Sequence, residues 1–229
     1  RILFTGASSF TGSWFAKNLQ KNGHQVFATL RSKKNDYKGV REVRIRQLQE
    51  IGVVFFENCS FGDIQFLEII ENYSFDVICH HGAQVENYKS LDFDVIKAVQ
   101  DNTHNTRKVF ELLKSSEVRS FVVTGSVFEE DEGLGTKPLR AFSPYGLSKG
   151  LSWQVFRYWG EQLGCPTHKF VIPNPFGPYE DPRFCAYLLK TWSHGEVARI
   201  GTPNYIRDNI HISLLAECYA EFIAKTIMQ

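Results

Sequence analysis

The sequence Thr5-Gly6-Ala7-Ser8-Ser9-Phe10-Thr11-Gly12 decides the fold, because it joins an apolar run at residues 1–5 to a segment of helical spacing with Trp14, Phe15 and Leu19. Gly23 ends that helical segment, and a second apolar run at residues 24–30 follows at once. The order is therefore strand, glycine turn, helix and strand. Such a unit predicts two parallel strands joined by a right-handed crossover.

The alternation of strand and helix continues along the chain. Short apolar runs predict further strands at residues 53–57, 75–79, 120–124 and 168–172. Helical periodicity lies between them, at residues 66–72, 93–115 and 146–163. We expect an α/β fold in which residues 1–173 form a doubly wound parallel sheet. Prolines and glycines interrupt residues 174–206, so residues 174–229 are expected to form a smaller C-terminal substrate-binding lobe, parts of which return to the first domain.

The composition excludes several classes of protein. The 229 residues are 43% hydrophobic and 22% charged, and the net charge of +1 gives no basic excess for binding nucleic acid. No apolar run approaches the roughly 20 residues that span a bilayer, and the first residues resemble a strand more than a secretory signal. We therefore expect a cytoplasmic protein without membrane partners. Because it begins inside an apolar run and stops on a helical segment, both ends are expected to be trimmed.

The five cysteines form an odd, scattered set without a C-x-x-C pair. A disulfide framework and a zinc site are therefore both unexpected, and the thiols should be reduced and mostly buried. His80 and His81 are adjacent at the end of a predicted strand, but no further ligand follows at a spacing that metals require. We expect no metal, and a structural or cofactor-adjacent place for both histidines.

The glycine turn predicts a phosphate-binding site. A turn between a strand and a helix presents free backbone N–H groups and the positive end of the helix dipole, where the pyrophosphate of a dinucleotide can bind. Glycines such as Gly6 and Gly12 permit a tight turn and close approach of the phosphate. Ser9 takes the place of the middle glycine of the usual fingerprint. A plain strand-to-helix loop therefore stays open as an alternative.

The end of the second strand bears on the choice of cofactor. An acid at this place binds the adenosine ribose of NAD, whereas an arginine accommodates the 2′-phosphate of NADP. The sequence has Leu30 followed by Arg31 and no acid, which favours NADP with Arg31 as the phosphate ligand. NAD stays the alternative if Arg31 is only a solvated loop residue. The later arginines of this region are most simply a solvated helix face: Arg41, Arg44 and Arg46.

Tyr145 and Lys149 form a candidate catalytic pair. They are four residues apart, on one face of a helix predicted to begin near Pro144. A nearby ammonium and an oxidised nicotinamide stabilise a phenolate, so Tyr145 could take or return the proton of a substrate hydroxyl. Ser126, just past the strand predicted to end at Thr124, could bind the same substrate oxygen.

These motifs together resemble the extended short-chain dehydrogenase/reductase family, which includes nucleotide-sugar epimerases, dehydratases and reductases. The matching residues span nearly the whole chain: residues 5–12, 80–83, 124–126 and 174–178, Asn102, Tyr145, Lys149, Arg207 and Asp208. The resemblance implies a Rossmann-type sheet and a chain that is longer at its C-terminus. It also implies a homodimer, in which the helix after Tyr145 and residues 93–115 pack against their symmetry mates. The apolar residues on more than one face of that helix, such as Trp153 and Trp159, agree with this, although burial under the C-terminal lobe would also explain them.

The resemblance also implies site residues. The cofactor would be bound by Gly6, Ser9, Phe10, Thr11, Gly12, Arg31, Gly82, Ala83, Asn102, Thr124, Tyr145 and Lys149. The catalytic residues would be Ser126, Tyr145 and Lys149. The substrate would meet Ser126, Asn174 and Arg207. Besides Ser9, two positions depart from the family pattern: Asn58 or Cys59 replaces an acid after the third strand, and Ser213 replaces an acid after the Arg-Asp pair.

We expect an epimerase of a nucleotide-linked sugar that uses a nicotinamide cofactor. The alternatives are an NADPH-dependent reductase of a keto sugar or other ketone, and a cofactor-binding regulator without turnover. Family members that eliminate water carry an adjacent Asp-Glu pair after the catalytic hydroxyl residue, whereas Val127 and Phe128 follow Ser126 here. Glu129 and Glu130 are expected to be solvated and out of reach. The sequence therefore argues against 4,6-dehydratase activity.

Overall fold

A computed structural model describes residues 1–133 and 140–228 and confirms the doubly wound α/β fold. Six parallel strands lie in the order β3-β2-β1-β4-β5-β6. Their bounds are β1 Ile2–Thr5, β2 Val26–Thr29, β3 Val54–Phe56, β4 Val77–His80, β5 Ser120–Ser126 and β6 Thr167–Ile172. The order reverses between β1 and β4, and in sheets of this kind ligands bind beyond the carboxyl ends of the strands at that point.

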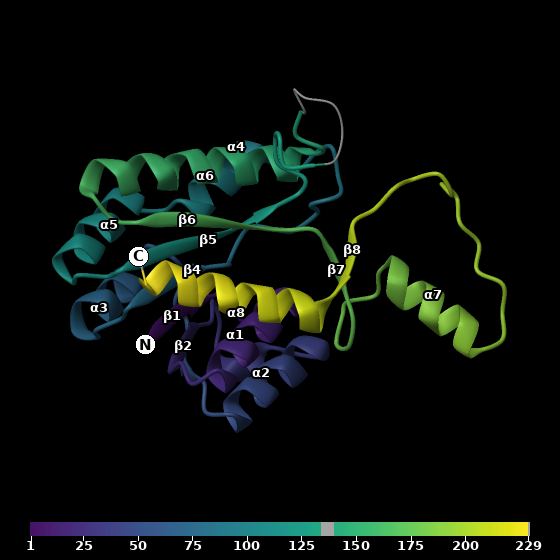
Figure 1. The fold of residues 1–229 in the computed structure, drawn as a ribbon, viewed down its shortest axis with the longest axis horizontal. Helices are drawn as coiled ribbons and strands as arrows, with labels where there is room; N and C mark the ends of the chain where they lie inside the picture. The colour runs from purple at the N-terminus through teal and green to yellow at the C-terminus, as the bar shows by residue number, and fades with distance from the viewer. Residues whose placement is uncertain (134–139, 229) are drawn as a thin grey trace.

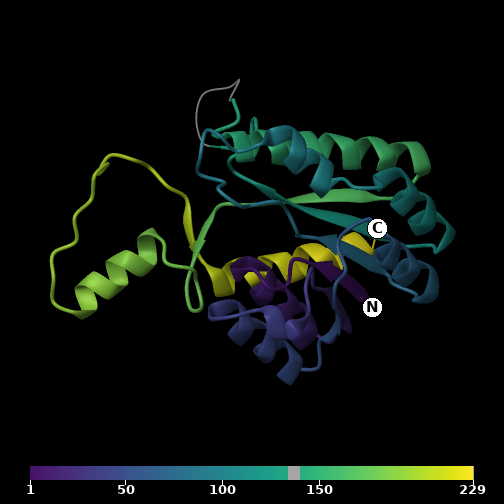
Figure 2. The ribbon, with the colours of Figure 1, turned by 180° about the vertical axis from the view of Figure 1, so that it is seen from behind.

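Helices cover both faces of the sheet (Figures 1 and 2). One face carries α1 Phe10–Lys21, α2 Val40–Glu50 and α8 Ile212–Met228. The other carries α3 Ile64–Asn72, α4 Val95–Asn102, α5 Thr106–Ser115 and α6 Pro144–Leu163, and a short 3-10 helix, Lys34–Asp36, follows β2. Beyond the sheet, β7 Asn174–Phe176 pairs in parallel with β8 Asn209–His211, and α7 Phe184–Ser193 projects away from the body (Figure 1). Within the described ranges, none of the helices is long and apolar enough to cross a membrane.

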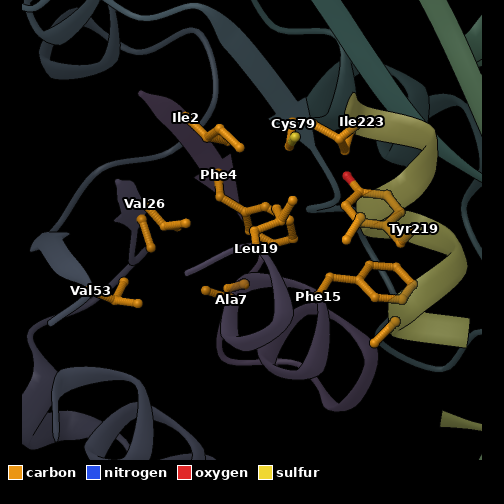
Figure 3. Packing of buried hydrophobic residues seen from close by; sticks show 14 of the residues in the cluster. Ile2, Phe4, Ala7, Phe15, Leu19, Val26, Val53, Cys79, Tyr219 and Ile223 are labelled. Carbon is orange, nitrogen blue, oxygen red and sulfur yellow. The ribbon is translucent and has the colours of Figure 1, made fainter. Parts of the chain in front are cut away.

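Successive side chains of β1 point to opposite faces of the sheet, so the core has two layers. Ile2 and Phe4 face the cluster that contains α1 and α8, whereas Leu3 faces the cluster that contains α3 and α5. In the first cluster, Phe15 of α1 stacks on Tyr219 of α8 with ring centroids 4.1 Å apart (Figure 3). Residues 212–228 therefore share the hydrophobic core of the N-terminal sheet, and the projecting lobe consists of residues 174–211.

The prediction of a single helix over residues 93–115 is wrong, because the structure has two helices there, α4 and α5, separated by residues 103–105. Asn105 adopts a left-handed conformation with φ of 51°, and its side-chain amide donates to the Gly62 carbonyl at 2.7 Å. The hydroxyls of Thr103 and Thr106 donate to the carbonyls of Val99 and Thr103. Such local side-chain bonds compete with a continuous helix, yet the hydrophobic period persists across the break.

Because α8 lies in the core and the Ile223 side chain is fully buried, we expect Ile223→Ala to destabilise the folded protein strongly. The free energy of unfolding should fall by about 2–5 kcal/mol, as for other buried Ile-to-Ala changes. Ile206→Ala is a matched control, since that side chain is 82% exposed, and it should change the free energy by less than about 1 kcal/mol. Urea denaturation measures both values. Equal, small losses would show that α8 does not belong to the folded core.

Candidate active site

The glycine turn packs backbone to backbone against the end of β4. Gly6 has φ of +80°, and a Cβ atom at this position would lie 2.8 Å from the Gly82 nitrogen. A Cβ on Gly12 would lie 2.2 Å from the Gly6 carbonyl oxygen. Only glycine fits both positions, because a Cβ at either would collide with backbone atoms, so the cradle formed by this turn keeps its shape only with glycine there.

The N-terminus of α1 is fixed by hydrogen bonds within the glycine turn. Ser9 caps the helix: its Oγ accepts from the Gly12 N–H at 3.1 Å and donates to the Gly6 carbonyl at 2.8 Å. The next two N–H groups, of Phe10 and Thr11, have no partner within the helix, and no other described residue accepts a hydrogen bond from them. The hydroxyl of Ser9 thus replaces the glycine of the fingerprint without blocking these two donors.

His81 connects the glycine turn to the end of β5, a link that the sequence did not predict. Its Nε2 lies 2.9 Å from the Thr11 Oγ1, and its Nδ1 lies 2.9 Å from the Thr124 Oγ1. Burial and the charge of Lys149 lower the pKa of His81 to about 3, so the ring is neutral, with one nitrogen donating and the other accepting. Among residues 1–133 and 140–228, no group of three or more His, Cys, Asp or Glu side chains could hold a metal ion.

The segment after β4 is fixed by hydrogen bonds from two sides. The Thr5 hydroxyl accepts from the Gly82 N–H at 2.9 Å. The Asn102 side-chain carbonyl accepts from the Gln84 N–H at 2.7 Å, and Asn102 is only 5% exposed. Ala83 is half-buried between these two anchored peptides. Asn102 therefore shapes the segment that contains Gly82 and Ala83.

Ser126 is the last residue of β5 and is 8% exposed, so the strand is two residues longer than predicted. Its Oγ accepts from the Phe128 N–H at 3.2 Å. Phe128 in turn meets the start of α6, where a Cβ on Gly146 would lie 1.9 Å from the Phe128 carbonyl oxygen. The turn after Ser126 and the first turn of α6 are thus packed together.

Tyr145 and Lys149 lie in the first two turns of α6, as predicted from their spacing. The Ser143 side chain caps this helix by accepting from the Gly146 N–H at 3.1 Å. The Tyr145 ring contacts the rings of Tyr88 and Phe93 edge to face, with centroids 5.7 and 6.1 Å away. Lys149 is 6% exposed, and its positive charge lowers the pKa values of both His80 and His81.

The electrostatics of this pair follow from burial. Burial raises the pKa of Tyr145 well above its usual value, the charge of Glu129 raises it further, and Arg183 lowers it. Burial lowers the pKa of Lys149 to about 8, whereas the charge of Glu129 raises it. Burial and the charge of Glu129 therefore favour the neutral, proton-bearing phenol.

The expectation that Glu129 is solvated is wrong. The residue is 2% exposed; its Oε1 accepts from the Ser126 N–H at 2.7 Å and its Oε2 lies 3.1 Å from the Lys169 ammonium. Glu130 is exposed, as expected. The ion pair with Lys169, 40 residues away on β6, offsets the desolvation of the carboxylate, and a local sequence pattern cannot reveal such a partner.

The expectation that the later arginines form a solvated face is wrong for Arg44, although Arg41 and Arg46 are exposed. Arg44 is 1% exposed and donates to the carbonyls of Ser8 and Tyr179, at 3.3 and 3.0 Å. It also pairs with Asp181 at 3.1 Å. Arg44 thus joins the glycine turn to the first loop of the C-terminal lobe.

Two further predicted residues follow strands at this edge of the sheet, and a third lies on the C-terminal lobe. Arg31 follows β2 and is exposed. Asn174 begins β7, two residues after Ile172, which is paired in register with Ser126. Arg207 is exposed, with its guanidinium 4.8 Å from the Tyr205 ring centroid and 5.4 Å from that of Phe184. The structure thus brings the glycine turn, Ser126 and the α6 pair to one edge, with Asn174 beside it and Arg207 on the lobe.

Two curated proteins are similar to this chain in sequence. A putative UDP-glucose 4-epimerase of Methanocaldococcus jannaschii is 22% identical over 94% of this chain and 71% of its own length. The dTDP-glucose 4,6-dehydratase of Salmonella typhimurium is 26% identical over 93% of this chain and 65% of its own length. The chain thus spans about two thirds of these relatives.

Solved structures show the same fold. The UDP-glucose 4-epimerase of Thermotoga maritima, solved with UDP-glucose, matches 95% of this chain and 71% of its own with a TM-score of 0.73 and 18% identity. The UDP-glucuronic acid 4-epimerase of Bacillus cereus, solved with UDP-glucuronic acid and NAD, matches 98% of this chain and 72% of its own with a TM-score of 0.74 and 20% identity. The sequence model of the NAD dependent epimerase/dehydratase family matches residues 2–227, and the chain therefore belongs to that family.

Proposed function

We propose that this chain is the cofactor-binding and catalytic part of an epimerase that acts on a nucleotide-linked sugar. The observation that supports this most directly is that the glycine turn after β1, Ser126 at the end of β5 and the Tyr145–Lys149 pair lie at one edge of the sheet. Family membership and the names of the relatives agree with this activity.

The residues present fit a nicotinamide dinucleotide. The cradle at Gly6 and Gly12 would admit the pyrophosphate close to the backbone, and the unpaired N–H groups of Phe10 and Thr11 would bind it. Gly82 and Ala83 would line the cofactor, held in place by Asn102 and, through His81, by Thr124. When bound, the nicotinamide supplies the hydride acceptor and donor that no side chain provides.

The side chains supply the proton chemistry. Tyr145 takes the proton of a sugar hydroxyl as the carbon that bears it is oxidised. It returns the proton after the keto sugar has rotated in the site to present its other face. Lys149 lies one helical turn after Tyr145, and its positive charge would stabilise the phenolate against the burial that favours the neutral phenol. Ser126 binds the same oxygen and orients it for transfer. We place Asn174 and Arg207 against the diphosphate of the substrate.

Within the family, epimerisation fits this site better than elimination of water. Val127 and Phe128 cannot transfer protons, and the carboxylate of Glu129 is engaged by the Ser126 N–H and by Lys169. No acid is therefore free beside Ser126, among the residues that the structure describes, to protonate a leaving hydroxyl. Reduction of a keto sugar is the second candidate, favoured by the exposed Arg31 at the end of β2, because NADPH is the usual reducing cofactor.

We further propose a homodimer formed through α4 and α6, which pack against each other. Large apolar side chains on these helices stay exposed in the single chain: Ile96, Leu147, Leu151 and Tyr158. The cytoplasm is the proposed compartment, because all five cysteines are free, as expected in a reducing environment.

The activity is tested by incubating the protein with nucleotide hexoses and either cofactor, and following the products by mass spectrometry and chromatography. We expect an epimer of unchanged mass. Tyr145→Phe should lower turnover by at least ~10²-fold, the usual loss for a general acid-base group, without changing cofactor affinity. Tyr73→Phe, a remote control with its ring 39% exposed, should keep full turnover.

Two outcomes would contradict the proposal. A product lighter by one water, formed at a catalytic rate, would make the protein a dehydratase. A Tyr145→Phe variant with near-full turnover would remove Tyr145 from the proton transfer.

Cofactor choice is tested with Arg31→Ala. Loss of a charged partner of the 2′-phosphate should weaken NADP binding by about 1.5–3 kcal/mol and leave NAD binding unchanged. Arg46→Ala, an exposed arginine of α2, is the control and should affect neither cofactor. Fluorescence titration of both cofactors measures the ratio. Equal losses for NAD and NADP, or none, would exclude Arg31 as the phosphate ligand.

A further inference from the structure

The turn that follows Ser126 contains a buried ion pair that the proton chemistry above does not use. Glu129 makes hydrogen bonds to both backbone polar groups of Ser126. Its carboxylate accepts from the Ser126 N–H at 2.7 Å, and its own N–H donates to the Ser126 carbonyl at 3.0 Å. A carboxylate that is only 2% exposed is stable only when its oxygens are paired. Lys169 supplies that pairing at 3.1 Å and also contacts the Glu132 carboxylate.

The neighbouring elements are shaped around this pair. A Cβ on Gly125 would lie 2.9 Å from the Lys169 Cδ and 3.0 Å from the Glu129 Oε1, so glycine makes room for both side chains. The Lys169 ammonium also lies 5.4 Å from the ring centroid of Trp153 on α6. The pair is thus enclosed by β5, β6 and the helix that carries Tyr145 and Lys149.

We propose that Glu129, held by Lys169, is a positioning residue of the active site: it fixes the peptide of Ser126 and sets the charge that the Tyr145 phenol faces. The proposal rests on the function proposed above for Tyr145 and Ser126. The sequence does not reveal this role, because the apolar Val127 and Phe128 directly follow Ser126. The carboxylate belongs to Glu129, three residues after Ser126, and it accepts a hydrogen bond from the Ser126 N–H.

Glu129 and Lys169 carry opposite charges, so we expect their removal to shift the pKa of Tyr145 in opposite directions. The negative charge of Glu129 disfavours the phenolate, so its removal should lower the pKa of Tyr145. Removal of Lys169 leaves that carboxylate uncompensated and should raise the pKa. The other groups that face Tyr145 and Lys149 are the same in every variant: Tyr88, Arg183, His80 and His81. Glu132 loses its contact with Lys169 in both variants that replace this lysine.

The test compares Glu129→Gln, Lys169→Met and the double variant, each with NAD bound. Ionisation of Tyr145 is followed by the ultraviolet absorbance of tyrosinate, as the difference between each protein and its Tyr145→Phe counterpart. Glu129→Gln should move the titration to lower pH by about one unit and Lys169→Met to higher pH, while the double variant should return close to the wild type. Glu130→Gln, at the exposed neighbouring acid, should leave the titration unchanged.

Two further features keep the test decisive. If Lys169→Met does not fold because of its unpaired carboxylate, the shift in Glu129→Gln and its reversal in the double variant, which has neither charge, still decide the outcome. With a substrate in hand, Glu129→Gln should lower kcat about tenfold with little change in KM. Folded variants that titrate like the wild type, or that all shift in one direction, would overturn the proposal. The titration needs no substrate, so a protein that epimerises nothing would contradict the proposed function and leave this result standing.

Discussion

The close packing of the Gly6 turn against Gly82 is the constraint on which the rest of the site depends. Because no Cβ fits between these two backbones, β1 and β4 end at the same level, and their following segments meet at the point where strand order reverses. The Thr5 hydroxyl then fixes the Gly82 peptide, and His81 extends the contact to Thr11 and Thr124. One glycine contact thereby aligns the turn for a cofactor with the strand that ends in Ser126.

Buried charges complete the arrangement around this contact. Arg44 ties the glycine turn to the loop at Tyr179, and Lys169 ties Glu129 to β6. Arg44 and Glu129 are nearly removed from solvent, so each is stable only with its partner in place. The first pair joins the glycine turn to the C-terminal lobe, and the second lies between β6 and the turn that packs against the helix of Tyr145.

Much of the fold could be predicted from the sequence, because it depends on local periodicity. The strands and the long helix after Pro144 follow apolar runs and turn residues, and their ends differ from prediction by one or two residues. The break between α4 and α5 was missed, because it depends on the bond from Asn105 to the distant Gly62 carbonyl. The burial of Arg44 was missed for a similar reason, since its partner Asp181 lies 137 residues away. Charged residues are normally solvated, so only tertiary structure could reveal these exceptions. The spacing of Tyr145 and Lys149 did place both on α6, whereas their roles stay predictions.

The central claim, that the Gly6 cradle binds the cofactor, is tested most directly by calorimetric titration of NAD into Gly6→Ala and Gly23→Ala. Both glycines have positive φ, +80° and +87°, so both variants carry the strain of a side chain in the left-handed region. A Cβ at Gly23 meets no atom within 4 Å, whereas one at Gly6 would lie 2.8 Å from the Gly82 nitrogen, so Gly6→Ala must displace the cradle from the end of β4. We predict at least a tenfold weaker NAD affinity for Gly6→Ala, about 1.4 kcal/mol, and wild-type affinity for Gly23→Ala. If the folded Gly6→Ala protein bound NAD as tightly as the Gly23→Ala protein, the cradle would not be the cofactor site.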